Sequence, residues 1–153
     1  MSMLDSYTYE VDVNWSGGPT GTIASEGLPL IDVSAPPEFH GEPGRWTPEH
    51  LLAASVASCF MSTFMAVARF QKAEVHGFRM RAFARMEKLP AEGYRFTEIT
   101  LVPEITVAQQ DVEKFLKIIE KAEKGCFVSK SLRATVQVEP HFTPAAVELC
   151  PQG

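Results

Sequence analysis

The first 44 residues contain no lysine or arginine, although they hold seven aspartates and glutamates, and the first basic residue is Arg45. The formal net charge is -5 over 153 residues, and no local cluster of basic residues offsets it. Such a chain lacks the positive surface that attracts nucleic acid or anionic lipid. We therefore expect neither nucleic acid nor a membrane as a partner. The acidic segment indicates a solvated sheet edge rather than a docking surface for a basic protein.

Cysteine and histidine are also scarce. The three cysteines, Cys59, Cys126 and Cys150, form no CxxC pair, and their odd number fits neither a disulfide framework nor a zinc ribbon. The four histidines show no HExxH or HxxxH spacing, so the sequence indicates no metal site and no cofactor. The N-terminus has no basic stretch followed by an apolar run, so we expect no secretion signal and a protein of the reducing cytoplasm.

The composition, 45% apolar and 22% charged, is typical of a globular protein, and the length fits one domain. Because no repeat or shift in composition divides the chain, we predict a single domain over residues 1–153. The order of the predicted elements is that of an α+β fold. Strands are expected at 7–15, 21–25, 30–33, 75–89, 94–107 and 135–142, and helices at 48–71 and 112–125.

The predicted helix 48–71 is unusually apolar. It begins with Thr47 as a hydroxyl cap, a proline at its first position, and Glu49 where a carboxylate complements the helix dipole. Between His50 and Arg69 lie 18 residues without a charge, nearly the length of about 20 that a membrane span needs. Its alanines, three serines and one threonine weaken partitioning into lipid, so we expect protein to cover it. One small sheet covers only part of such a helix, and a second copy of the chain would cover the rest.

The predicted strands 75–89 and 94–107 are joined by a short Pro- and Gly-containing turn, which indicates a long antiparallel hairpin. Within the first strand, Arg79, Arg81 and Arg85 alternate with apolar residues. The period of two predicts one basic face in water and one apolar face toward the core.

Two cysteines are candidates for chemistry. Cys59 lies about three turns into the apolar helix, where a free cysteine is commonly a small core residue. Cys126 follows Gly125 at the end of the second helix, where an array of backbone N–H groups would stabilise a thiolate. These thiols can form a reversible pair if the fold brings their Cα atoms within about 7 Å. A peroxide would then oxidise Cys59 to a sulfenic acid, and Cys126 would resolve it to a disulfide.

Glu49 is the candidate carboxylate. It precedes Cys59 by ten residues, which on one straight helix is a rise of about 15 Å, too far for contact. Antiparallel packing of two copies of the helix about a two-fold axis would bring Glu49 of one chain toward Cys59 of the other. The alternative is that Glu49 only complements the helix dipole.

Residues 47–54, TPEHLLAA, lead to Ala57-Ser58-Cys59-Phe60 and together resemble the signature of the OsmC/Ohr family, the osmotically inducible and organic hydroperoxide resistance proteins. Residues 126–132, CFVSKSL, are similar to the second cysteine motif of that family, usually Cys-Pro-Val-Ser. The predicted order of strands and helices agrees over about residues 7–142. Two motifs at matching separation make the resemblance specific.

The resemblance implies an OsmC-like α+β fold, in which an antiparallel sheet packs on a long central apolar helix and two chains form an intertwined homodimer. It also implies a reactive thiol at Cys59, a resolving thiol at Cys126 and a carboxylate at Glu49. The implied activity is the reduction of organic hydroperoxides, with electrons supplied by a dithiol of the lipoyl type.

The chain departs from the family at the arginine that pairs with the reactive thiolate. Glu38 stands where that arginine is expected, and a carboxylate near a thiolate raises its pKa instead of lowering it. Arg45 is the candidate substitute, although it also fits a solvated loop residue. His40 and His50 are weaker candidates for a positive charge at this site. Phe127 replaces the usual proline of the second motif.

Three functions compete. The first is a dithiol peroxidase that uses Cys59 and Cys126. The second is a binding protein that keeps the fold and an apolar pocket but has lost efficient peroxide chemistry, in which case the pKa of Cys59 would be unperturbed. The third, metal binding by cysteine and histidine, has little support because the spacings do not fit.

Overall fold

The computed structural model describes residues 4–146 and has an α+β fold, as the sequence predicts. The chain divides into two compact units, residues 1–51 and 52–153. The single domain expected from composition stays a prediction. The long apolar helix α1, Pro48–Phe70, begins at the end of the first unit and belongs mainly to the second.

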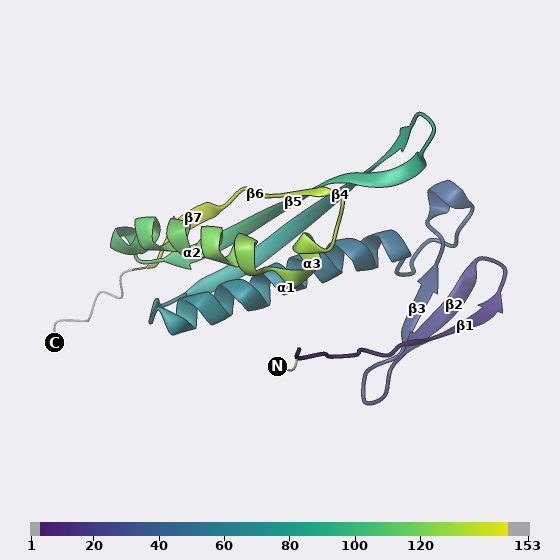
Figure 1. Ribbon diagram of the computed structural model, residues 1–153, viewed down its shortest axis with the longest axis horizontal. Helices are drawn as coiled ribbons and strands as arrows, with labels where there is room; N and C mark the ends of the chain where they lie inside the picture. Colours follow the sequence, from purple (N-terminus) through teal and green to yellow (C-terminus); the bar gives the residue numbers. More distant parts are fainter. Residues whose placement is uncertain (1–3, 147–153) are drawn as a thin grey trace. The chain divides into compact units, whose positions relative to one another are not determined.

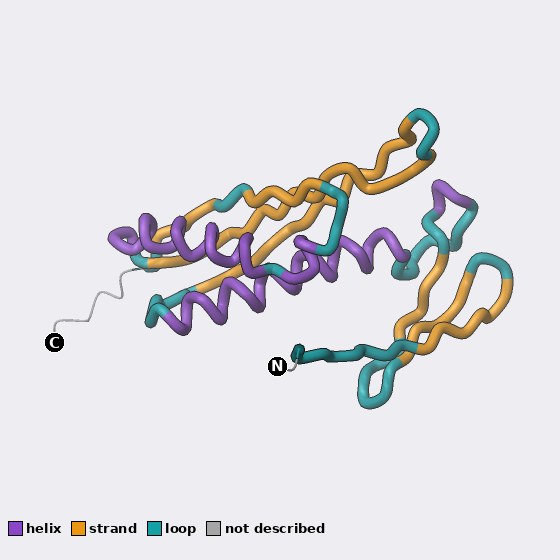
Figure 2. The backbone as a smooth tube through the Cα atoms, viewed as in Figure 1, coloured by secondary structure: helices purple, strands orange, loops and turns teal. Residues whose placement is uncertain are grey.

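The first unit contains a three-stranded antiparallel sheet in the order β1-β2-β3 (Figure 2). The strands are β1, Asp12–Gly17, β2, Thr20–Ala24, and β3, Ile31–Ser34. Gly17 and Gly18 form the β1–β2 turn with φ values of 123° and 52°, a conformation that glycine adopts without a steric penalty. The two strands predicted at 7–15 and 21–25 are confirmed, although the first begins five residues later than expected.

The connection from β3 to α1 is held in one shape by its backbone. It contains the short 3-10 helix η1, Pro37–Phe39. At Gly41 a Cβ atom would lie 1.5 Å from the carbonyl oxygen of Ala35, so only glycine fits. Thr47 then caps α1, because its Oγ1 accepts a hydrogen bond from the backbone N–H of His50 at 3.1 Å.

The second unit is built on the hairpin of β4, Gly77–Leu89, and β5, Gly93–Val107. The single strand expected at 135–142 is divided into β6, Thr135–Val138, and β7, His141–Pro144. Both run parallel to β5, so the sheet expected to be antiparallel is mixed. The helix that follows β5 carries the chain back along the sheet, which makes the next strand parallel. Pro140, which has no N–H, lies in the interruption between β6 and β7.

Helices α1 and α2, Val112–Gly125, lie on one face of this sheet (Figure 1). The short helices η2, Gln109–Asp111, and α3, Phe127–Lys130, flank α2 in sequence. On the opposite face of β4, Arg79, Arg81 and Arg85 are exposed, as their alternation predicts. The sheet therefore has one exposed face, on which Glu104 and Glu98 of β5 lie opposite Arg79 and Arg85, and one face against the core.

Much of α1 is not covered within the chain. Over its most apolar 18 residues only 22% are buried, and by length and composition alone the helix could cross a membrane. Two of its exposed hydroxyls already donate within the helix, from Ser58 Oγ to the carbonyl of Ala54 and from Ser62 Oγ to that of Ser58, both at 2.7 Å. The uncovered side is composed mainly of small residues and methionine.

Phe64 occupies the centre of the core. Its side chain is fully buried and its ring lies 5.3 Å from that of Phe78 on β4 and 6.0 Å from that of Phe115 on α2. The ring therefore joins α1 to the sheet and to the second helix. Aromatic pairs at such distances add to the stabilisation that burial provides.

We predict that Phe64→Ala lowers the free energy of unfolding by roughly 3 to 5 kcal/mol, because the cavity it leaves cannot collapse between three elements. Phe70→Ala, at a side chain that is 88% exposed, is the matched control and should change the free energy by less than about 1 kcal/mol. Urea unfolding followed by circular dichroism measures both. Equal losses in the two variants would contradict this assignment of the core.

Candidate active site

The fold brings Cys59 and Cys126 together, although 66 residues separate them in the chain. Both are free thiols; Cys59 on α1 is partly buried, whereas Cys126, between α2 and α3, is fully buried. Each thiol influences the pKa of the other through a hydrogen bond between their side chains. The fold therefore makes the two thiols neighbours, which sequence alone left open.

A close approach of two helices creates this proximity. Gly125 ends α2 beside Thr63 of α1, and a Cβ at Gly125 would lie only 3.1 Å from the Thr63 Cγ2 atom. A larger residue would press α2 away from α1. Because Thr63 lies one turn after Cys59 and Cys126 directly follows Gly125, this contact sets the spacing between the thiols.

Cys59 lies where its thiolate is stabilised. Burial raises the pKa of Cys59, but hydrogen bonds from the Val128 backbone, the Cys126 thiol and the Phe127 backbone outweigh burial and bring the pKa below its ordinary value. Phe127 and Val128 begin α3, so their N–H groups have no partner within the helix and are available to the sulfur. Two of the backbone donors expected at Cys126 thus serve Cys59, whereas the backbone of Ser129 serves Cys126.

Thr63 is a further donor. Its hydroxyl donates to the carbonyl oxygen of Cys59 at 2.8 Å, and it also contributes to the lowered pKa of the Cys59 thiol. One hydroxyl hydrogen serves one acceptor at a time, so rotation about the Cβ–Oγ1 bond chooses between carbonyl and sulfur. No sequence pattern indicates this role, because a threonine in an apolar helix is commonly a packing residue.

Cys126 has the opposite electrostatic environment. Burial raises the pKa of Cys126 above its ordinary value, and the neighbouring Cys59 raises it further. The hydroxyl of Ser129 donates to Cys126 Sγ at 3.1 Å and opposes this change without cancelling it. At neutral pH Cys126 is therefore protonated, and its S–H can donate to the Cys59 sulfur.

The other two predicted site residues belong to the first unit. Glu49 follows Pro48 at the start of α1, and its Oε2 atom is buried without a hydrogen-bond partner among residues 4–146. Arg45 lies in the preceding loop, where its Nε donates to Glu42 Oε2 at 3.0 Å and its Nη1 lies 3.6 Å from Asp32 Oδ1. The roles of Arg45 and Glu49 toward the thiols stay predictions.

The weaker candidates for a positive charge lie in the same unit. The ring of His50 forms a hydrogen bond through Nδ1 with Thr47 Oγ1 at 2.7 Å, so this histidine takes part in the cap of α1. His40 is exposed and ends η1 with a positive φ of 64°. Glu38, in η1, is exposed.

In the described part of the chain, no three His, Cys, Asp or Glu residues are grouped as metal ligands would be. Cys150 lies outside the described residues.

The sequence model of the OsmC-like protein family matches residues 40–141, a span that includes Cys59, Cys126 and Glu49. The chain belongs to the OsmC-like family. It is similar to peroxiredoxin OsmC of Escherichia coli, with 34% identity over 104 residues that cover 66% of this chain and 69% of the relative. It is also similar to the uncharacterised protein YmaD of Bacillus subtilis, with 26% identity over 144 residues that cover 90% of this chain and 93% of YmaD.

Solved OsmC-like structures share this fold. An organic hydroperoxide resistance protein from Legionella pneumophila superposes with a TM-score of 0.71 at 28% identity, covering 90% of this chain and 99% of that one. An OsmC-like protein from Vibrio cholerae gives a TM-score of 0.81 at 20% identity, over 88% of this chain and 99% of the other. Members of the family are thus linked to peroxiredoxin activity and organic hydroperoxide resistance, which confirms the family expected from the two motifs.

We predict that Phe127→Pro raises the pKa of Cys59. Proline is tolerated at the first position of a helix, so α3 should persist, but proline lacks the N–H that donates to the sulfur. At a pH between the original and the raised pKa, less Cys59 is thiolate, and alkylation by iodoacetamide slows. Phe127→Ala is the matched control, since it removes the exposed ring and keeps the N–H. Alkylation rates against pH, mapped to Cys59 by mass spectrometry, test this, and identical profiles for the two variants would refute the role of this N–H.

Proposed function

We propose that this chain reduces organic hydroperoxides through a reversible reaction of Cys59 and Cys126. The observation that carries the proposal is a pair of adjacent free thiols with opposite pKa shifts, lowered at Cys59 and raised at Cys126. The shifts assign the two roles, because the thiol with the lower pKa supplies the attacking thiolate. Cys59 is also the more exposed of the two, so a substrate reaches it first.

In the first step the Cys59 thiolate attacks the terminal oxygen of the hydroperoxide. An S–O bond forms, the O–O bond breaks, and the alkoxide leaves and takes up a proton to become the alcohol. The sulfur is oxidised to a sulfenic acid and the peroxide is reduced. Cys126 S–H, held beside the Cys59 sulfur, is one source of that proton, and losing it prepares Cys126 for the second step.

In the second step the Cys126 thiolate attacks the Cys59 sulfur of the sulfenic acid. An S–S bond forms and the sulfenic oxygen leaves as water after taking up a proton. A dithiol of the lipoyl type then reduces the disulfide by exchange, which returns both thiols and leaves the reductant oxidised. This cycle suits a reducing compartment such as the cytoplasm, because the dithiol must be kept reduced.

We also propose that the chain acts as a homodimer. Only 22% of the most apolar 18 residues of α1 are buried within the chain. Exposed aromatic and aliphatic side chains also lie along β1 and the segment that precedes it. These are Tyr7, Tyr9, Val11, Val13 and Trp15, which share one side of an alternating pattern. Exposed apolar area of this kind marks an interaction surface.

A dimer gives Glu49 and Arg45 a place in the reaction. Oε2 of Glu49 is buried without a donor in the described chain, which is costly unless a partner subunit or a substrate supplies one. Antiparallel pairing of α1 about a two-fold axis brings it toward the partner's Cys59. Arg45 is engaged by Asp32 and Glu42, so a role beside the thiolate requires the release of at least one of these ion pairs.

We predict that an organic hydroperoxide converts the reduced protein to a form with a Cys59–Cys126 disulfide, which peptide mapping by mass spectrometry detects. Cys59→Ser should abolish turnover, since no thiolate remains to attack the O–O bond. Cys126→Ser should stop the reaction at a sulfenic acid that dimedone traps. Cys150→Ser is the matched control and should leave turnover unchanged.

Unchanged turnover in Cys59→Ser would contradict the proposed reaction. Two wild-type thiols that persist in excess hydroperoxide would instead favour an OsmC-like binding protein with little peroxidase activity, with Glu38 in place of the family arginine as the cause.

For the homodimer we predict a mass twice the 16.9 kDa of the chain by sedimentation or light scattering. Met61→Asp should yield monomers, because it places a charge on the uncovered side of α1 without altering the core. Leu116→Asp is the matched control, since Met61 and Leu116 are helical and 42% and 44% exposed. A monomeric wild-type protein, or dissociation by Leu116→Asp alone, would contradict α1 as the interface.

A further inference from the structure

The two sulfurs of the cysteine pair are not equally open to a reductant. Cys126 is fully buried, with 0% of its surface exposed, whereas Cys59 is only partly buried. A dithiol reduces a disulfide when its thiolate attacks one sulfur and the other sulfur leaves. The attacked sulfur must be reached from outside the protein, so access favours attack on Cys59.

Attack on Cys59 makes Cys126 the leaving group, which is the less favourable direction by acidity alone. A thiol with a low pKa leaves more easily, yet burial raises the pKa of Cys126, whereas the pKa of Cys59 is lowered. The Cys126 sulfur, which belongs to the apolar core cluster, must therefore take up negative charge when it leaves. A buried charge of this kind requires a hydrogen-bond donor.

Ser129 supplies that donor. Its Oγ donates to Cys126 Sγ at 3.1 Å, and its backbone also acts to lower the pKa of Cys126. The turn of α3 holds the serine in place, because Lys130 N–H donates to the Cys126 carbonyl at 3.2 Å and Leu132 N–H donates to the Ser129 carbonyl at 3.3 Å. Residues three apart in a helical turn lie on one side, which places the hydroxyl beside the sulfur.

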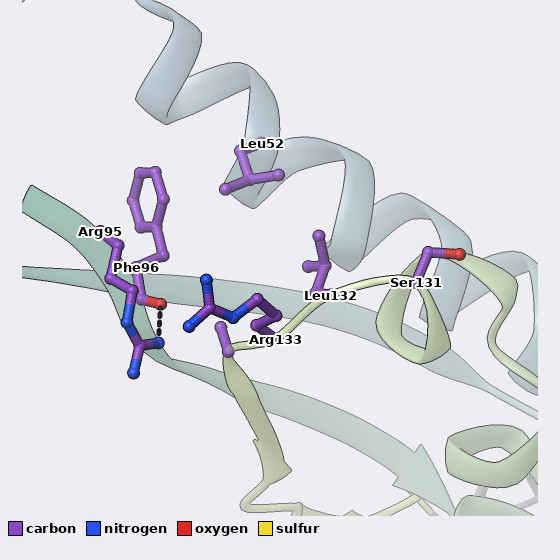
Figure 3. Close-up of a pocket in the computed structure, with 7 residues that line it drawn as sticks. Leu52, Arg95, Phe96, Ser131, Leu132 and Arg133 are labelled. Carbon is purple, nitrogen blue, oxygen red and sulfur yellow. Dashed lines mark hydrogen bonds between the residues drawn. The ribbon is translucent and has the colours of Figure 1, made fainter. Parts of the chain in front are cut away.

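The direction of this hydroxyl differs from that of other helical serines in the same region. Ser58 and Ser131 each donate to the backbone carbonyl four residues earlier, at 2.7 Å and 2.8 Å. Figure 3 shows Ser131 on the turn that follows α3, with its side chain pointing away from Arg133. Ser129 instead donates to a sulfur, so its one hydroxyl hydrogen is committed to Cys126.

We propose that a dithiol reductant attacks the Cys59 sulfur of the Cys59–Cys126 disulfide, and that the Ser129 hydroxyl stabilises Cys126 as it leaves. The S–S bond between the cysteines breaks and an S–S bond forms between Cys59 and the reductant. Cys126 keeps the electron pair as a thiolate and then takes up a proton. The second thiolate of the reductant attacks the reductant sulfur of this mixed disulfide, so the reductant is oxidised to its internal disulfide and Cys59 leaves as a thiolate.

Ser129 is then a catalytic residue for the reductive half of the cycle, because its hydroxyl contacts a reacting sulfur. The inference rests on the proposed function, in which the two cysteines form a reversible disulfide. It adds which sulfur the reductant attacks and which side chain assists the sulfur that leaves.

The first test measures reduction of a disulfide that diamide has formed, which needs no peroxide chemistry. Cys150→Ser protein is used throughout, so that only the cysteine pair reacts. Dithiothreitol is added, samples are quenched with acid, and the free thiols are counted. Ser129→Ala should slow the reduction by about tenfold, since a hydrogen bond to a charged group contributes on that order.

Two further variants separate the hydroxyl from a structural effect. Ser129→Thr retains the donor and should restore a rate close to that of the unsubstituted protein. Ser131→Ala is the matched control, because it removes a hydroxyl from the same segment that donates to the backbone, and it should leave the rate unchanged. Equal rates for Ser129→Ala and the unsubstituted protein, or a loss that Ser129→Thr does not restore, would overturn the role of Ser129.

The second test locates the attacked sulfur in the protein with Ser129 intact. The diamide-formed disulfide is treated with 2-mercaptoethanol, a monothiol that cannot close an internal disulfide. Early samples are quenched with acid, alkylated and mapped by mass spectrometry. The adduct should lie on Cys59 with Cys126 alkylated, and an adduct on Cys126 would overturn the proposed direction of attack.

The outcomes also distinguish this inference from the proposed function. If diamide forms the disulfide and both tests give the expected results while no hydroperoxide forms it, the proposed function fails and the inference stands. If hydroperoxide forms the disulfide but Ser129→Ala is reduced at the unchanged rate, only the inference fails. Failure of diamide to join the two thiols would overturn both.

Discussion

The contact between Gly125 at the end of α2 and Thr63 on α1 is the constraint on which the candidate site depends. The cysteines are distant in sequence, and no covalent link or metal holds them in the described chain. What keeps them adjacent is helix packing, which allows only small groups at this crossing. The buried phenylalanines of α1 and α2 stabilise the packing of the two helices. The small residues at the crossing allow the helices to approach closely, which keeps the two thiols adjacent.

The chemistry of the pair arises from two opposing effects that act on neighbouring atoms. Burial disfavours a thiolate at either cysteine, and at Cys126 this effect prevails. At Cys59 it is outweighed by donors that converge on one sulfur. Most of these donors are main-chain or thiol groups, and no arginine is among the groups that lower the pKa of Cys59.

The sequence predicted the elements well because their patterns are strong. Thr47 and Pro48 marked the start of α1, the alternation around Arg79, Arg81 and Arg85 marked β4, and Gly125 marked the end of α2. The parallel direction of β6 and β7 was missed, because alternation reports which face a residue occupies and carries no information on strand direction.

At the site, the sequence identified the two cysteines by their motifs but not the groups that shift the pKa of each thiol. Backbone N–H donors belong to every residue except proline, so their direction toward Cys59 depends on the turn between α2 and α3 and not on residue type. Thr63 likewise carried no sign of a role in the sequence, since a threonine in a helix is ordinary. Its relevance comes from its position one turn after Cys59 and beside Gly125, which is far away in the chain.

The hydroxyls of Ser58 and Ser62 lower the free-energy cost of burying the uncovered side of α1. Because the hydroxyl hydrogens of Ser58 and Ser62 are already donated to the helix backbone, removing these side chains from water leaves no unpaired donor. Short side chains also lose little rotational entropy when they are immobilised. This side of α1 therefore has a low desolvation cost and a low ordering cost, so a modest contact area is enough to make burial of the helix favourable.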